Sequence, residues 1–197
     1  DVIIKNSSVN FEGFINLTSC NNLLLTSNVK SMANFFKGDL RLTSLSLNAS
    51  SDLSSVTSMA YMLNGCIGIS TTPILEIPNS VTNIDYIYNG TNITSLDNLV
   101  IGSGITSATN WNPSNLRSIN NMVIKNNVIK FTGNTIIQSA ENLTRPNSTN
   151  WDSYFEGCTS LRNDVLFPLS VTSARNCYKG CTSLAYVHKN WEQNYTN

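Results

Sequence analysis

Few side chains in this chain of 197 residues have the chemistry of a catalytic site. The one histidine, His188, could serve a Ser-His-Asp or Cys-His arrangement, which needs a single imidazole. No nucleophile-elbow motif stands near it, so we interpret His188 as a surface or packing residue. Asp152 and Glu156 are four residues apart and resemble a glycosidase carboxylate pair, but acidic neighbours on an exposed helix face are usually solvated charges. We therefore expect no enzyme activity and no cofactor.

The chain has five cysteines, an odd number, and no CxxC pair. A zinc site would need four ligands at suitable spacing, so we expect no metal. Three cysteines directly follow a glycine in a repeated motif, and two interpretations stay open for them. Cys158 and Cys181 could form a disulfide between adjacent repeats, or all three could be small buried thiols in a ladder. The ladder is favoured because other repeats place Asp39 and Thr91 at the same position. The cysteines are Cys20, Cys66, Cys158, Cys177 and Cys181.

The composition excludes several classes of protein. Twelve basic and twelve acidic residues leave no net charge, and a neutral chain without a Lys/Arg cluster is not expected to bind nucleic acid. No run of 18 apolar residues exists, so we expect no membrane span. An apolar share of 41% is enough to build a core, which argues against disorder. The 30 Asn and 45 Ser plus Thr residues favour turns and short loops over helix interiors.

These side chains are carried by an internal repeat, which is the main evidence for the fold. Apolar residues at positions one, four, seven and eight of the repeat predict one face of a helix of about two turns. The glycine at position ten then ends the helix. That glycine is Gly38, Gly65, Gly90, Gly157 or Gly180. The five segments are VKSMANFFKGD from Val29, VTSMAYMLNGC from Val56, VTNIDYIYNGT from Val81, STNWDSYFEGC from Ser148 and VTSARNCYKGC from Val171.

Short apolar triplets lie between these segments, and each is long enough for one short strand. Their starts are 20 to 30 residues apart, and Pro or Gly follows several of them. One coil of the chain is therefore strand, turn, short helix and turn in about 23 residues. The triplets are 2–4, 23–25, 45–47, 75–77, 99–101, 122–124, 143–145, 165–167 and 185–187.

Stacked coils of this length predict an α/β solenoid of the leucine-rich-repeat type, because one coil cannot bury its apolar side alone. We expect a single domain over 1–197 with about eight to nine coils, short parallel strands on one face and short helices or irregular segments on the other. The coils from Ile105 and Val128 lack the glycine at position ten, and Pro113 interrupts the first. We therefore expect irregular structure over about 103–142, with a helix starting at Leu116 as an alternative alignment.

The motif VTSMAYMLNGC, with VTSARNCYKGCTSL and STNWDSYFEGCTSL, resembles the BspA-like leucine-rich repeat. The resemblance extends over the whole chain; it is specific in five coils and degenerate in 9–20 and in the coils from Ile105 and Val128. It implies a non-enzymatic recognition or adhesion module of bacterial or protist surface proteins, or of phage tails and baseplates. The implied location is a virion or the extracellular or cell surface.

The middle residue of each strand triplet should point away from the interior. Most of these residues are apolar or aromatic, which is unusual for a solvated sheet face. We hypothesise that another chain, a neighbouring domain or a bound receptor covers this outward row; the alternative is a shifted register that turns the residues inward. The row comprises Ile3, Leu24, Ser46, Glu76, Val100, Val123, Thr144, Leu166 and Tyr186.

The aromatic residues divide by their position in the repeat. Tyr88, Phe155 and Tyr178, at position eight, should lie in the core, whereas Tyr61 and Tyr86, at position six, should face outward. Trp111 is a further candidate for the surface. Neither end has an obvious polar capping element, so we expect the ends to abut further protein in a longer chain or a larger assembly.

The resemblance to BspA-like repeats, with the neutral Asn/Ser/Thr-rich surface and the uncapped ends, implies a phage tail, fibre or baseplate component that contributes to host binding. A bacterial cell-surface adhesin or lipoprotein ectodomain is the alternative, and a carbohydrate-active enzyme is a third class. The expected partners are a protein or glycan receptor on a cell surface and neighbouring structural proteins or symmetry mates.

Overall fold

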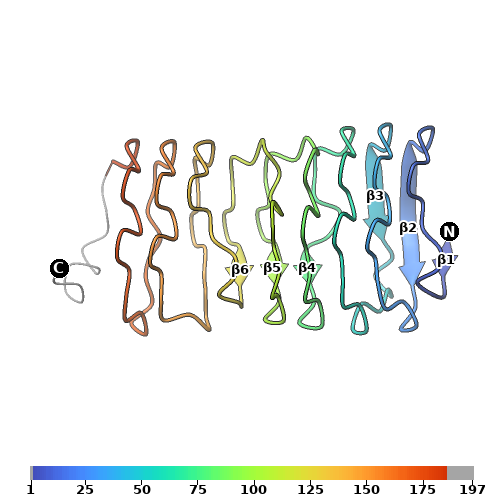
Figure 1. Ribbon diagram of the computed structural model, residues 1–197, viewed down its shortest axis with the longest axis horizontal. Coiled ribbons are helices and arrows are strands. Elements are labelled where there is room, and N and C mark those ends of the chain that lie inside the picture. The colour runs from blue at the N-terminus through green and yellow to red at the C-terminus, as the bar shows by residue number, and fades with distance from the viewer. Residues whose placement is uncertain (1, 186–197) are drawn as a thin grey trace. The chain divides into compact units, whose positions relative to one another are not determined.

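The computed structural model describes residues 2–185, and its regular secondary structure is short parallel strands (Figure 1). Each strand overlaps one of the predicted triplets, so the first six triplets are confirmed as strands. At the triplet 143–145, Thr144 forms a single parallel bridge to Val123. The strands are β1 (Ile3–Ile4), β2 (Ser19–Leu25), β3 (Ser44–Leu47), β4 (Glu76–Ile77), β5 (Val100–Ile101) and β6 (Val123–Ile124).

The chain divides into two compact units, each described by itself below. Unit 1 comprises the chain up to Thr94 together with Gly102–Asn115, and it holds β1 to β4. Unit 2 comprises Ser95–Ile101 and the chain from Leu116 onward, and it holds β5 and β6. The single domain over 1–197 stays a prediction.

Within each unit, successive coils run in the same direction and bond to each other. In unit 1, β1, β2 and β3 form a parallel sheet in that order, with Ile3 opposite Leu24 (Figure 1). In unit 2, Val100 of β5 lies opposite Val123 of β6. A second ladder of parallel bridges in unit 1 joins the third positions of successive repeats: Ser31, Ser58, Asn83 and Ser107.

The five predicted helices, from Val29, Val56, Val81, Ser148 and Val171, are wrong: no residue in 2–185 is helical. A helix would bond each N–H to the carbonyl four residues back. Here Phe35 N–H donates to the Met32 carbonyl in a three-residue turn, and Asn34 within it has a φ of 60°. The alternate N–H groups of Met32, Asn34, Phe36 and Gly38 donate instead to Ser58, Ala60, Met62 and Asn64 in the next coil.

The glycines at position ten also have positive φ, and they stack on one another. A Cβ added at Gly90 would lie 3.2 Å from both the Cα and the N of Gly65. The glycine is therefore required by close coil packing as well as by its φ of 75°. The expectation that the Val128 coil lacks this glycine is wrong, because Gly133 takes its place in the stack. A Cβ added at Gly157 would lie 3.5 Å from the Cα of Gly133.

The region expected to be irregular, 103–142, continues the ladders of both units. In unit 1, Thr106 N–H donates to the Thr82 carbonyl at 2.8 Å. In unit 2, Ser118 bridges to both Ser95 and Ser139. The alternative alignment from Leu116 gives the correct register, but the helix that it predicts is wrong. The sixth residue of this segment, Asn121, is in a turn and has positive φ, and so do the equivalent residues of the adjacent coils. Those equivalent residues are Asn98 and Asn142.

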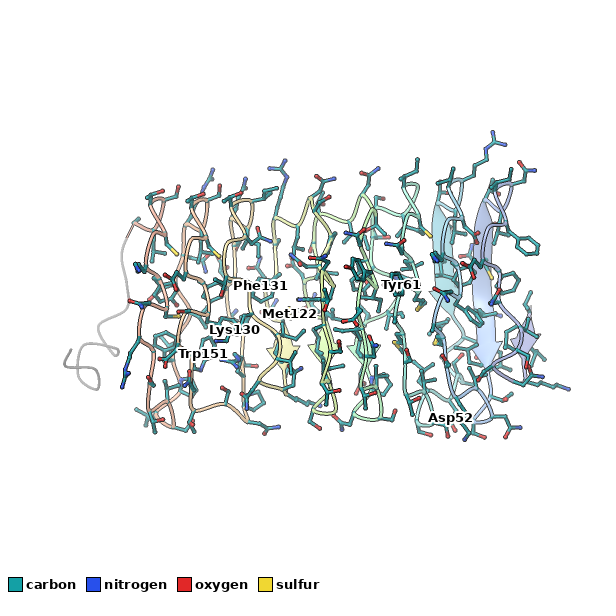
Figure 2. All side chains as sticks on the ribbon, in the orientation of Figure 1. Asp52, Tyr61, Met122, Lys130, Phe131 and Trp151 are labelled. Atoms are coloured by element: carbon teal, nitrogen blue, oxygen red, sulfur yellow. The ribbon has the colours of Figure 1, made fainter. Side chains whose placement is uncertain are left out.

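The core of each unit consists of like residues stacked from coil to coil. In unit 1, Phe11 stacks on Phe36 with ring centroids 5.2 Å apart. In unit 2, Phe131, marked in Figure 2, stacks on Phe155, which in turn stacks on Tyr178. Tyr88 and Phe155 are buried as predicted, and Tyr178 is half-buried. Trp111, expected as a surface candidate, is only 4% exposed.

We expect Gly90→Ala to lower the free energy of unfolding by about 2–3 kcal/mol, because a side chain in the left-handed region costs about 1–2 kcal/mol and the new Cβ meets Gly65. Gly38→Ala is the matched control: its φ is 78°, yet no atom lies within 4 Å of the added Cβ, so the loss should be about 1–2 kcal/mol. Urea unfolding measures both. Equal losses would contradict the glycine ladder.

Candidate functional site

The outward row lies where the sequence predicts, at the solvent side of the strands. In unit 1, Leu24 is half-buried while Ser46 and Glu76 are exposed, and Ile3 is 52% exposed. In unit 2, Val100 and Val123 are half-buried, Thr144 is exposed, and Leu166 is 60% exposed. The alternative of a shifted register, with these residues turned inward, is therefore wrong. Tyr186 lies outside the described residues.

Three outward residues of unit 2 are adjacent. Val100 pairs with Val123 in register, and Val123 bridges to Thr144. Their strand neighbours point the other way: Leu99 and Ile101 are fully buried. The alternation places two β-branched apolar side chains next to each other on the solvent side of β5 and β6. Such an arrangement suits contact with another apolar surface.

Some predicted inward positions of the triplets depart from the pattern: Val2 is 42% exposed, and Ala185 is also exposed. Leu75, before β4, is 63% exposed rather than buried. Arg145 occupies an inward position that is apolar in most other triplets, and it is buried. Alternation in the sequence predicts the burial of Arg145 but not what compensates its charge.

Tyr61 and Tyr86 form a stacked pair at position six of their coils, in unit 1. Their ring centroids are 4.9 Å apart, and Lys37 Nζ lies 5.5 Å from the centre of the Tyr61 ring. Both residues have positive φ, 59° and 55°, which is uncommon for aromatic residues. Tyr61 is exposed, as predicted, and Tyr86 is half-buried. Lys37 and Tyr86 flank the Tyr61 ring, so this ring is poorly suited to stacking on a ligand. The Tyr61–Tyr86 pair instead extends the stacking of the coils to the surface.

Asp152 and Glu156 do not form a carboxylate pair, because each interacts with the next coil. Ser173 Oγ donates to Asp152 Oδ1 at 2.5 Å, and the Arg175 N–H donates to the same oxygen at 2.7 Å. The hydrogen bond from Ser173 is the main reason that the pKa of Asp152 is lowered. Glu156 forms an ion pair with Lys179 at 3.3 Å.

The Asp152 arrangement recurs, and sequence reasoning missed it. In this arrangement, a carboxylate or amide oxygen at position five of one coil accepts two hydrogen bonds from the next coil. One comes from the hydroxyl at position three, and the other comes from the backbone N–H at position five. Asp85 accepts from Ser107 and Thr109 in this way, at 2.7 and 2.6 Å. In unit 2, Asp97 accepts from Ser118 and Asn120, and the Asn120 amide oxygen accepts from Ser139 and Glu141. We call this contact the Asx–Ser clamp.

The cysteines are all free thiols, so Cys158 and Cys181 do not form the disulfide that was the alternative to stacked thiols. Cys66, Cys158 and Cys181 donate to the carbonyls of Phe36, Phe131 and Phe155 in the preceding coil, at 2.9–3.1 Å. Burial raises the pKa of Cys66 and of Cys158 to about 12, so these thiols stay protonated.

Asp39 occupies the thiol position in its coil and is fully buried. Its Oδ1 accepts the Phe14 N–H at 2.8 Å, but Oδ2 has no hydrogen-bond partner. Burial is the main reason that its pKa is raised to about 6. A protonated Asp39 presents an O–H donor where Cys66 presents an S–H donor.

Residues 2–185 contain no group of three or more His, Cys, Asp or Glu side chains placed to hold a metal ion. Over the same residues, no helix has the length and hydropathy that a membrane crossing requires. His188 lies outside the described part of the chain.

Comparison with known proteins gives one structural match. No protein-family model matches the chain, and the search of curated proteins found no match. A solved structure of a leucine-rich cell surface protein from Faecalibacterium prausnitzii A2-165 is 14% identical, with a TM-score of 0.29. The match covers 100% of this chain and 86% of that protein.

We expect Asp152→Ala to lower the free energy of unfolding by about 2 kcal/mol, because hydrogen bonds to a charged group contribute about 1.5–3 kcal/mol. Asp152→Asn is the matched control, since Asn120 makes the same clamp with an amide oxygen. That variant should lose less than about 1 kcal/mol. Chemical denaturation measures both, and equal losses would show that the clamp contributes nothing.

We expect the difference in stability between Asp39→Asn and the wild type to depend on pH. Asp39 has a higher pKa folded, about 6, than in the unfolded chain, where 3.8 is the ordinary value. Folding therefore favours its neutral form, and stability is lost as pH rises from about 4 through about 6. The amide does not titrate, so its advantage should grow by up to about 3 kcal/mol between pH 4 and pH 8. Denaturation at both pH values tests this; an advantage that shrinks as pH rises would contradict it.

Proposed function

We propose that this chain is a non-enzymatic recognition module displayed on the surface of a cell or a virion, and that its outward strand row contacts a protein or glycan receptor. The observation that carries the proposal is the adjacent pair Val100 and Val123 on β5 and β6. Core positions of these strands are occupied by residues that stack from coil to coil. The outward positions are free to vary without breaking the coil stacking, as a recognition surface requires.

The composition supports the same function. Charged residues are 12% of the chain, and four carboxylates of the described residues are engaged by the neighbouring coil: Asp85, Asp97 and Asp152 accept inter-coil hydrogen bonds, and Glu156 pairs with Lys179. Their hydrogen bonding supports a structural role for these groups. A virion component that contributes to host binding and a cell-surface adhesin would both use such a module.

A paired set of variants tests the recognition surface. We expect the double variant Val100→Lys and Val123→Lys to reduce binding of the labelled chain to its receptor at least tenfold, because two desolvated ammonium groups would oppose contact. Thr144→Lys adds a charge at the adjacent outward position, which is already polar and exposed, and should reduce binding less. Flow cytometry on bacterial and host cells and a glycan array measure the binding.

Light scattering of the same variants reports the state of assembly. If the double variant binds and assembles like the wild type, the outward row of unit 2 is not a recognition surface. Release of reducing sugars from the bound glycans would overturn the non-enzymatic assignment. Immunogold labelling of cells and of phage particles with an antibody to the chain decides which surface displays it.

A further inference from the structure

Unit 2 contains a buried guanidinium, Arg145, at a position that is apolar in most other strand triplets. Only 1% of Arg145 is exposed. Its Cζ lies 4.2 Å from the ring centre of Tyr154 and 4.9 Å from that of Trp151. The centres of the two rings are 4.9 Å apart, so the three side chains form one cluster. Trp151 of this cluster is labelled in Figure 2.

The hydrogen bonding of this cluster is incomplete. Arg145 Nη1 donates to the Asn150 carbonyl at 2.8 Å, and Nη2 donates to Asn127 Oδ1 at 3.3 Å. Three further groups are buried and have no partner: Arg145 Nε, Trp151 Nε1 and Tyr154 Oη. Two of them can only donate, and the third is a hydroxyl. Buried polar groups are almost always hydrogen-bonded, so three orphans in one cluster indicate a missing acceptor.

The charge of the cluster is also uncompensated. The two ion pairs among the described residues involve Lys37 and Lys179, not Arg145. The neighbouring Cys177 thiol supplies no negative charge, because burial raises its pKa to about 12. Burial likewise raises the pKa of Tyr154 and keeps its hydroxyl neutral. Contact with two aromatic faces stabilises the cation but offers no acceptor to its N–H groups.

We infer that the Arg145–Trp151–Tyr154 cluster binds a small monoatomic anion of the halide class, with chloride as the physiological ion. An anion within reach of the three orphan donors would satisfy them and neutralise the guanidinium at once. A water molecule would accept at most two of these hydrogen bonds and would leave the charge uncompensated. A halide also has no further polar atoms that would need partners in this buried cluster, as an oxyanion would.

Bromide crystallography tests the site directly. Crystals of the full chain grown with sodium bromide in place of sodium chloride, measured at the bromine absorption edge, should show an anomalous peak between Arg145, Trp151 and Tyr154. Density without an anomalous signal would identify a water molecule and overturn the inference. An empty cluster, or bromide bound only at the surface, would also overturn it.

Thermal unfolding tests the site in solution. When chloride replaces gluconate at constant ionic strength, the wild-type Tm should rise by about 2–4 °C, because a ligand that binds only the folded state stabilises it. Arg145→Met should abolish this rise. Arg117→Met, which removes an exposed cation of the same unit, is the matched control and should keep it. Equal chloride responses of the wild type and Arg145→Met would contradict the inference.

A second variant covers the case in which Arg145→Met does not fold. Trp151→Phe retains the aromatic ring and the guanidinium but removes one orphan donor. The chloride concentration that gives half of the Tm rise should increase at least fivefold in this variant. An unchanged concentration would mean that Trp151 Nε1 does not bind the anion and would contradict the proposed site.

Discussion

The structure depends on main-chain hydrogen bonds that leave each coil and end in the next one. Met32, Asn34, Phe36 and Gly38 donate to four alternate carbonyls of the following coil, and the turn around Asn34 is closed by a single three-residue bond. Because a buried N–H without a partner is costly, one coil cannot satisfy its own backbone. Each coil is therefore held in place by its neighbours, which explains why the same residue types recur at about the same interval along the chain.

The strand positions could be predicted from the sequence, and the helices could not. Apolar triplets such as 99–101 and 122–124 are each long enough for one short strand, and the structure has β5 and β6 there. Apolar residues at positions one, four, seven and eight suit a helix, but they equally suit a chain that turns inward every three to four residues. Asn34 and Gly38 in the left-handed region distinguish the two, because a helix cannot continue through them.

The candidate surface could be predicted better than the contacts that support it. Alternation alone places Val100 and Val123 outward, since a strand has a period of two. The Asx–Ser clamp had a usable signal: Asp97 and Asn120 stand at the same repeat position, and each is followed about 20 residues later by the serine that it binds. The composition of the chain predicts only that its Asn, Ser and Thr residues favour turns and short loops, and it does not pair them. Gly133 was missed because the motif around it retains little besides the glycine and Phe131.

Polar residues that depart from the repeat pattern at inward positions carry a free-energy cost of burial. In a stack of coils, each inward side chain is surrounded by the equivalent residues of two neighbours, so a polar residue in such a column cannot reach solvent. Asp39, which stands where Cys66 stands in the next coil, meets this constraint because burial raises its pKa and so favours the neutral acid. Arg145 cannot meet it in that way, because a guanidinium keeps its proton across the physiological range. Its charge must instead be matched from outside the repeat, and the donors beside it show what kind of group can do so.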